Sequence, residues 1–380
     1  MDFSLTEEQQ MLRLSVRRFL ENECSIEARR NVPAHEQNRD HWPAIAELGW
    51  LAIPLPEAVG GLGGGAVEMT LIMEEFGRVL AVEPFSAVGV LAAQTLLAAD
   101  PQKSELLIPK LIAGETRPVV AHHEHESRGA IEHVAMQATA IDSEKWVLNG
   151  RKSLVIGANV ADQFIVSARS KGKVRDREGI TLFVVDRSAP GIQQQDIRLI
   201  DNRLCAELVF DSVEVSAGNV LGKVGEGYRA LDHAFAYGLL AQCAEAVGVM
   251  EKALWITRDY IKTRKQFGAS LNTFQSLQHR MAEMLIELEL ARSMVYRSLA
   301  YIDAPSDERN TALSLAKVKV GQAVRFVCAQ AIQLHGGIGV TEEYSIGHYF
   351  KRAITIENEL GSSHMHLAQL ADRELHHHAA

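Results

Sequence analysis

Two segments in the C-terminal third carry residue types that bind anionic ligands. The first reads Thr263-Arg264-Lys265-Gln266-Phe267-Gly268 and is followed by Phe274-Gln275. An arginine can hold a phosphate through two parallel hydrogen bonds, an aromatic ring can pack on an adenine, and a helix start attracts anions. This segment therefore predicts a binding site for an anion and an adenine. A helix hairpin with a surface arginine explains the same residues equally well, so the motif alone leaves both interpretations open.

The second segment is Gln333-Leu334-His335-Gly336-Gly337-Ile338-Gly339, at the predicted end of a helix. Glycine lets a ligand approach the backbone closely because it has no side chain. A helix C-cap needs only one glycine. The two additional glycines therefore favour a binding function over a simple helix end.

Two further motifs give weaker signals. Gly61-Leu62-Gly63-Gly64-Gly65-Ala66 matches a dinucleotide-binding pattern, but Pro54 and Pro56 disrupt the strand that this pattern requires. A flexible connection is the favoured interpretation.

His122-His123-x-His125 suggests a metal site, but neighbours on an extended segment point to opposite faces. A solvated loop is favoured there, and we expect no bound metal.

These motifs need elements that hold them in place, and the hydrophobic pattern predicts three successive regions. The first is helical: Thr6 and Gln9 form a capping box, and helical periodicity continues through 41–48, 67–80, 86–99 and 103–112. The second, from Val119, alternates in the manner of strands. The third, after Gly225-Glu226-Gly227, consists of long helices over 228–263, 273–301, 311–334 and, in part, 344–373.

The middle region predicts an all-β sandwich or barrel. Turn signals, including Asn149-Gly150 and Ala189-Pro190-Gly191, separate runs rich in β-branched residues. The predicted strands cover 133–141, 145–148, 153–156, 164–168, 180–185, 192–197 and 206–215. We therefore expect an α+β chain with an N-terminal helical domain (1–118), a middle β domain (119–224) and a C-terminal four-helix bundle (225–380) that has a face for oligomer contacts.

Length and composition narrow the class of protein. The 380 residues are 47% hydrophobic and 23% charged, which is typical of a globular chain of two or three domains. The net charge of −9, from 39 basic and 48 acidic residues, argues against a nucleic-acid partner. The four cysteines are too scattered for a disulfide framework, MDFSLTEEQQ does not resemble a signal peptide, and the uncharged run 84–99 is too short to span a membrane. A cytoplasmic location is expected.

The arginine and glycine motifs, in this order and on this α–β–α plan, resemble the acyl-CoA dehydrogenase family. Pro56-Glu57-x-x-Gly60-Gly61-Leu62-Gly63 also fits that family. The resemblance implies FAD as cofactor and the α,β-dehydrogenation of an acyl-CoA thioester to a trans-2-enoyl-CoA. A carboxylate base removes the α-proton while the flavin takes the β-hydride, and an acceptor such as an electron-transfer flavoprotein takes the electrons. In this family one chain grips the adenosine and pyrophosphate of its neighbour's FAD, a role that the resemblance assigns to Arg264, Phe267, Gln275, Gln333, Gly336 and Gly337.

The flavin-facing half and the base depart from the family pattern. The usual Thr-Glu-Pro-Gly-x-Gly-Ser-Asp segment falls at His122 to Ala130, and the usual Trp-Ile-Thr appears as Leu154-Val155-Ile156. At the two known base positions stand Leu360 and Gly238, neither of which can accept a proton. Glu359 is one residue away, which on a helix is a rotation of about 100 degrees.

These departures resemble the small, β-type subunit of heteromeric acyl-CoA dehydrogenases, such as pimeloyl-CoA dehydrogenase or the steroid side-chain enzymes. In such an α2β2 heterotetramer the partner chain supplies the base and the flavin pocket. Fatty acid or steroid catabolism is the implied context, and the acyl chain itself is not predicted. Two alternatives stay open: a homo-oligomeric dehydrogenase with a displaced carboxylate base such as Glu359, and a non-enzymatic scaffold subunit.

Overall fold

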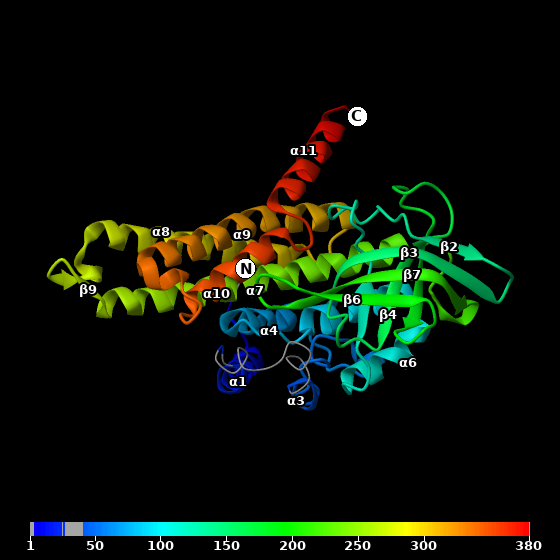
Figure 1. The fold of residues 1–380 in the computed structure, drawn as a ribbon, viewed down its shortest axis with the longest axis horizontal. Helices are drawn as coiled ribbons and strands as arrows, with labels where there is room; N and C mark the ends of the chain where they lie inside the picture. The colour runs from blue at the N-terminus through cyan, green and yellow to red at the C-terminus, as the bar shows by residue number, and fades with distance from the viewer. Residues whose placement is uncertain (1–3, 25, 27–40, 380) are drawn as a thin grey trace. The chain divides into compact units, whose positions relative to one another are not determined.

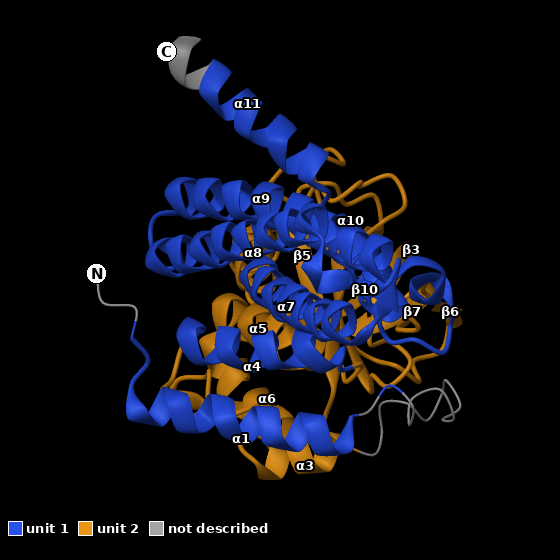
Figure 2. Ribbon diagram, turned by 90° about the vertical axis from the view of Figure 1, so that its left-hand side faces the viewer, with its two compact units in different colours: residues 1–32, 66–81, 239–380 blue, residues 33–65, 82–238 orange. Residues whose placement is uncertain are grey.

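The computed structural model of the chain describes residues 4–24, 26 and 41–379. They form two compact units, each assembled from segments that are distant in the sequence (Figure 2). Unit 1 contains Met1–Val32, Ala66–Ala81 and Leu239–Ala380, and unit 2 contains Pro33–Gly65 and Val82–Gly238.

Unit 1 is helical, and α7, α8 and α9 are its three longest helices (Figure 1). Its helices are α1 (Glu7–Glu23), α4 (Ala66–Val79), α7 (Gly227–Thr263, which begins in unit 2), α8 (Gln275–Tyr301), α9 (Ser306–His335), α10 (Ile346–Asn358) and α11 (Ser363–Ala379). The predicted capping box at the start of α1 is confirmed, since Thr6 and Gln9 bond reciprocally. Helices α4 and α7 cross closely through glycines: a Cβ on Gly77 would lie 2.0 Å from the carbonyl oxygen of Glu245.

Unit 2 combines short helices with one hydrogen-bonded sheet of eight strands. The helices are α3 (Trp42–Glu47), α5 (Ala93–Ala99), which continues the π-helix η2 (Ser86–Ala92), and α6 (Pro101–Ile112). The strands are β1 (Pro118–Ala121), β2 (Gln137–Ala140), β3 (Lys145–Ile156), β4 (Gln163–Arg169), β5 (Ile180–Asp186), β6 (Ile192–Arg198), β7 (Leu204–Ser216) and β8 (Val220–Leu221). Their order is β6-β7-β3-β2-β4-β5-β8, and β1 pairs with β4 in parallel.

Two details of the predicted strands are wrong. Asn149-Gly150 is not a turn but a bulge inside the continuous strand β3, where the register with β7 shifts. Gly150 has φ +146°, and the Asn149 side chain accepts a hydrogen bond from the Ser212 backbone N–H at 2.8 Å, so the pair bends the strand without ending it. The strand expected over 133–141 shrinks to β2, because the backbone N–H groups just before it bind a carboxylate instead of a neighbouring strand.

The glycine-rich connection near residue 61 is tightly bonded, contrary to the expected flexible link. The backbone N–H groups of Gly61, Leu62, Gly63 and Gly64 all donate to backbone carbonyls of residues 52–56. A Cβ on Gly61 would lie 2.1 Å from the carbonyl oxygen of Leu55, so only glycine fits there. The motif therefore has a packing role in a closed loop.

The predicted fold class is confirmed: helices come first, a β domain follows, and long helices complete the chain. None of the described helices combines the length and the apolar character that a membrane crossing requires.

Candidate functional site: one end of the helical bundle

The arginine-containing segment forms the tip of a helical hairpin. Helix α7 ends at Thr263, the strands β9 (Lys265–Gln266) and β10 (Ala269–Ser270) pair as a small hairpin, and α8 begins at Gln275. Figure 1 shows β9 at the end of the bundle where α7 stops and α8 starts. Arg264, Phe267 and Gln275 therefore lie at the same end of unit 1.

The glycine-rich segment after α9 lies at the same end of unit 1 as Arg264, Phe267 and Gln275, as contacts of α9 show. The Tyr260 ring, one turn before Arg264, stacks on the His335 ring with centroids 4.3 Å apart, and its hydroxyl donates to the His335 carbonyl at 3.2 Å. On α8, Arg280 donates to the Gln330 side chain of α9 at 2.6 Å. Because α8 and α9 run antiparallel, this pair brings the start of α8 beside the end of α9. The structure thus gathers all six predicted cofactor-binding residues at one end of the α7–α8–α9 bundle.

All six of these residues are exposed. Exposure is unusual for a phenylalanine, and at the two glycines it leaves the backbone open to solvent. Phe267 is 90% exposed with φ +54°, and its ring meets Phe274 edge-on at 6.2 Å. Gly336 has φ +64° and ψ −141°, a backbone conformation that only glycine adopts readily. A Cβ on Gly336 or Gly337 would meet nothing within 4 Å. These residues leave room for a group from outside the chain.

The start of α8 adds a backbone contribution to this site. Its N-cap is Phe274, which makes no side-chain capping bond. The first backbone N–H groups of an uncapped helix, together with its positive dipole end, attract phosphate. Arg264 and the N-terminus of α8 therefore both contribute positive charge at this end of the bundle.

Candidate functional site: the flavin-facing segment

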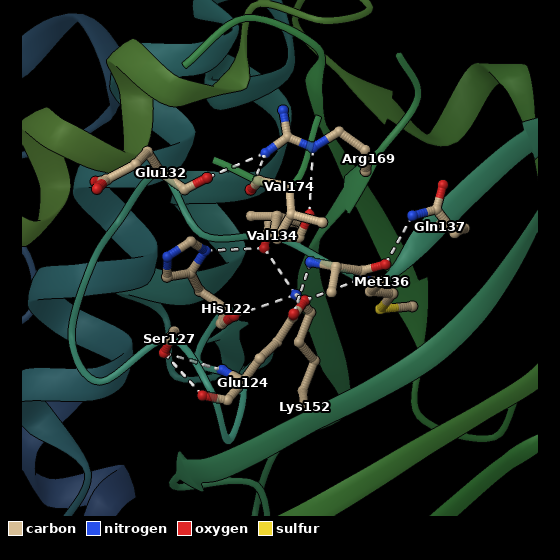
Figure 3. A network of polar contacts seen from close by, with 12 residues as sticks. His122, Glu124, Ser127, Glu132, Val134, Met136, Gln137, Lys152, Arg169 and Val174 are labelled. Atoms are coloured by element: carbon tan, nitrogen blue, oxygen red, sulfur yellow. Dashed lines mark hydrogen bonds and ion pairs between the residues drawn. The ribbon is translucent and has the colours of Figure 1, made fainter. Parts of the chain in front are cut away.

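The segment at residues 122–130 rests on a buried ion pair that sequence analysis does not identify (Figure 3). The fully buried Nζ of Lys152 on β3 donates to Glu124 Oε1 at 2.7 Å, to the His122 carbonyl at 3.1 Å and to Ser167 Oγ at 3.1 Å. Burial lowers the pKa of Lys152 to about 8, although the Glu124 carboxylate opposes that shift. Glu124 also accepts from the backbone N–H groups of Ala135 and Met136, at 2.7 and 3.1 Å.

His122 is part of this network, so the expectation of a solvated loop is wrong for this residue. It is 1% exposed, and its Nδ1 lies 2.9 Å from Ser167 Oγ. Ser167 accepts from Lys152, so its own hydroxyl proton is free to donate to Nδ1 of His122. Burial first, and the Lys152 charge second, lower the pKa of His122 well below its usual value, so the imidazole is neutral at pH 7.

Arg169 fixes the backbone on the other side of the same network (Figure 3). Arg169 is 2% exposed, and its guanidinium donates five hydrogen bonds to backbone carbonyls at 2.7–3.2 Å. The acceptors are the carbonyls of Glu132, Val134, Val174, Asp176 and Glu178. One side chain thus ties two loops together, and no local sequence pattern predicts such an arrangement.

Two histidines lie in this segment, and apolar side chains, Leu154 and Ile156, occupy the positions where the family pattern has a tryptophan and a threonine. The His122 and His123 rings stand edge-on to Phe235, at 5.1 and 5.5 Å. Leu154 has φ +51° and is 51% exposed, within the second register shift of β3. Ile156, at the end of β3, carries no hydroxyl.

Candidate functional site: the expected base positions

Leu360 lies in a tight turn after α10 whose carbonyl groups are held by two buried side chains. It has φ +57°, unusual for a leucine. Lys317 donates to the carbonyls of Ile356 and Glu359, the latter at 2.8 Å, and His366 Nε2 donates to the Leu360 carbonyl at 3.0 Å. Burial lowers the pKa of Lys317 to about 8 and that of His366 to about 4. The backbone at the expected base position is therefore well supported, although its side chain cannot accept a proton.

Glu359 is the carboxylate nearest in sequence, but it is held in an ion pair. Its Oε2 lies 3.1 Å from Arg352, whose guanidinium also binds Glu245 through two bonds of 2.8 and 2.7 Å. A base at Glu359 would have to leave Arg352 first. The second expected position, Gly238 within α7, has no side chain at all.

Comparison with known proteins

Family models cover most of the chain. The acyl-CoA dehydrogenase N-terminal, middle and C-terminal domain models match residues 6–115, 124–213 and 225–375. "Probable acyl-CoA dehydrogenase YngJ" of Bacillus subtilis is 30% identical, over 96% of this chain and 97% of its own length. This chain belongs to the acyl-CoA dehydrogenase family. Family members are oxidoreductases that act on CH–CH bonds, and membership implies FAD as the cofactor.

Two solved structures share the fold over nearly their whole length. Butyryl-CoA dehydrogenase from Megasphaera elsdenii superposes with a TM-score of 0.90 at 26% identity, covering 99% of this chain and 100% of that one. A variant of the Tcur3481-Tcur3483 steroid ACAD gives a TM-score of 0.86 at 29% identity, covering 98% and 99%.

The residues of this chain fit one end of FAD and not the other. The bundle end offers a guanidinium, an exposed ring, an uncapped helix start and open glycine backbone, which suit an adenosine diphosphate group. The flavin-facing segment lacks the hydroxyl and the indole of the family pattern, since Ile156 and Leu154 stand there. The bundle end is therefore the part of this chain whose chemistry suits an adenosine diphosphate group.

Proposed function

We propose that this chain is the small, β-type subunit of a heteromeric FAD-dependent acyl-CoA dehydrogenase. In this proposal Arg264, Phe267, Gln275, Gln333, Gly336 and Gly337 bind the adenosine and pyrophosphate end of FAD that a homologous partner subunit holds by its flavin end. The observation that carries the proposal is the gathering of these exposed residues at one end of the bundle, in a chain whose two base positions are Leu360 and Gly238.

The chemistry divides accordingly between the two subunits. FAD, when bound, supplies the hydride acceptor for the dehydrogenation of an acyl-CoA. This chain contributes positive charge from Arg264 and the α8 N-terminus, which stabilise the pyrophosphate, and backbone access at Gly336 and Gly337. The partner subunit provides the carboxylate that removes the α-proton, because Glu359 is held by Arg352.

The steroid ACAD with two named components supports the heteromeric arrangement by analogy. The proposal also includes an α2β2 assembly and a cytoplasmic location. Its substrate would be a steroid or fatty acyl-CoA, and its electron acceptor an electron-transfer flavoprotein. The domain boundaries at 118/119 and 224/225 remain part of it as well.

Arg264→Ala in the co-purified complex tests this proposal. Loss of a charged, bidentate phosphate contact should weaken FAD retention by about tenfold or more. Lys265→Ala is the matched control, because this neighbouring exposed cation lies on β9 and is not assigned to the cofactor. The measurement is FAD per complex by visible absorbance after extensive dialysis. Equal retention in both variants and the wild type would contradict the assignment of Arg264.

A homo-oligomeric enzyme with Glu359 as its base is the second candidate, favoured by the position of that carboxylate beside Leu360. In a purified homomer, Glu359→Gln would then abolish bleaching of the flavin by acyl-CoA. Bleaching that survives this substitution would exclude Glu359.

A further inference from the structure

The backbone turn at Gly336 and Gly337 has no side chain of its own that could hold it in place. Gly336 ends α9 with φ +64° and ψ −141°, and its backbone N–H donates to the carbonyls of Gln333 and Ile332. Glycine visits many other backbone conformations at little cost, so these torsion angles are one choice among several. The conformation of the turn must therefore be set by the residues around it.

His335, the residue directly before the turn, is the centre of this support. It is 3% exposed, and its ring stacks on Tyr260 of α7 with centroids 4.3 Å apart. Tyr344, between η5 (Gly336–Val340) and α10, tilts against the His335 ring at 5.0 Å and lies 6.1 Å from the Tyr260 ring. Tyr260, His335 and Tyr344 are called here the three-ring cluster. Each ring comes from a different segment, so the cluster ties the end of α9 to two neighbouring segments.

Contacts of His335 reach the backbone on both sides of the two glycines. Before the turn, the His335 carbonyl accepts a hydrogen bond from the Tyr260 hydroxyl at 3.2 Å. After the turn, Gly339 folds back so closely that an added Cβ would lie 3.0 Å from the Cβ of His335. The chain thus enters and leaves the turn against the same residue. The position of His335 therefore determines where Gly336 and Gly337 expose their backbone.

The outer nitrogen of the His335 ring makes no contribution to this support. Nδ1 lies 2.7 Å from the Ala331 carbonyl oxygen, which can only accept, so Nδ1 carries the proton. Burial lowers the pKa of His335, so the ring is neutral at pH 7 and Nε2 is an acceptor. Nε2 is buried and has no hydrogen-bond partner among the described residues, which costs stability. A phenyl ring would make the same ring contacts without that cost.

We propose that His335 is a positioning residue for the cofactor, whose ring holds the Gly336–Gly337 backbone ready for the adenosine end of FAD. His335 acts through the turn and does not itself touch FAD. Because the turn is ordered before binding, less conformational entropy is lost when FAD arrives. This inference rests on the proposed function, since it requires the two glycines to bind FAD, but the ordering of the turn is a property of the chain alone.

Hydrogen exchange of the chain purified alone tests the ordering in the absence of cofactor. Mass spectrometry follows the backbone N–H groups of residues 336–344 in the wild type, His335→Ala and His335→Phe. We expect His335→Ala to raise the exchange rate by about tenfold or more, because the three-ring cluster loses its central ring, and His335→Phe to keep it within about twofold. Equal rates in the wild type and His335→Ala would overturn the inference.

The FAD affinity of the co-purified complex tests the positioning. After FAD is removed, titration with FAD followed by visible absorbance gives the Kd of the wild type, His335→Ala, His335→Asn and His335→Phe. Asparagine keeps a donor near the position of Nδ1 but has no ring. We expect Kd to rise by about tenfold or more for alanine and asparagine and to be restored by phenylalanine. Restoration by asparagine and not by phenylalanine would overturn the inference, because the polar group would then be what matters.

Arg264→Ala in the same titration separates this inference from the proposed function. If Arg264→Ala weakens FAD binding and His335→Ala does not, the positioning role alone is wrong. If neither changes Kd, both the positioning role and the proposed function are wrong. Tyr344→Leu removes another, half-buried ring of the cluster and replaces His335→Ala if circular dichroism shows that variant to be unfolded. It should raise both the exchange rate and Kd, and wild-type values of both would overturn the inference.

Discussion

Replacing Lys152 by methionine removes the cation at the centre of the buried network while keeping most of the length of the unbranched side chain. The Glu124 carboxylate, 6% exposed, would then be left with two backbone N–H donors and no charged partner. Removing one member of a buried ion pair costs about 3–5 kcal/mol of the free energy of unfolding. For a unit of this size that corresponds to a fall in melting temperature of roughly 6–20 °C.

The double variant Lys152→Met/Glu124→Gln is the matched control. It removes both charges and leaves an amide oxygen that can still accept one of the two backbone N–H groups, so at least half of the lost stability should return. Thermal and urea unfolding followed by tryptophan fluorescence measures both variants, and Trp146 on β3 reports from the same strand. A fall of less than about 2 °C for Lys152→Met, or a double variant less stable than the single one, would refute the reasoning.

The same variant predicts a pH dependence. The pKa of Lys152 is about 8 in the folded chain, against an ordinary value of 10.5. Between these values the unfolded chain binds more protons, so the wild type gains stability relative to Lys152→Met as the pH rises from about 8 to 10.5. The gain amounts to about 3 kcal/mol at most. A difference between the two proteins that is constant over this range would show that Lys152 titrates normally.

Three further predictions concern unit 1. Burial holds the pKa of His366 at about 4, below its ordinary 6.5, so the wild type should lose stability relative to His366→Asn as the pH falls from 6.5 to 4 in thermal melts. Gly321→Ala in α9 should destabilise the chain by about 1–3 kcal/mol, because its Cβ would lie 2.0 Å from the Glu357 carboxylate of α10; an unchanged melting temperature would contradict this close packing. Gly337→Ala should leave the melting temperature unchanged, since its Cβ meets nothing, while lowering FAD retention by the complex; normal retention would remove Gly337 from the cofactor site.

The long helices are predictable from sequence because their apolar spacing is regular and their ends carry ordinary signals. The periodicity predicts a helix over 228–263, and α7 begins only one residue earlier. The Asn149-Gly150 pair misleads because the same dipeptide that favours a two-residue turn also suits a bulge, and only the pairing of β3 with β7 distinguishes the two. Local sequence alone cannot contain that information.

The candidate site likewise has one part that can be predicted from the sequence and one part that cannot. The cofactor-binding residues are recognisable as motifs because each group is contiguous in the sequence, and packing at Tyr260 and His335 then brings the groups together. The partners of Lys152, by contrast, come from two distant segments, His122–Glu124 and Ser167, so nothing near position 152 distinguishes a buried lysine from an exposed one. Only tertiary structure identifies such residues.

The most direct test of the central claim is the FAD content per chain, measured by visible absorbance on the protein purified alone and again after co-expression with a homologous dehydrogenase subunit. A chain that supplies only the grip for the adenosine end should carry little or no flavin alone and should recover it in the complex. One tightly bound FAD per chain in the protein purified alone would contradict the shared-site heteromer.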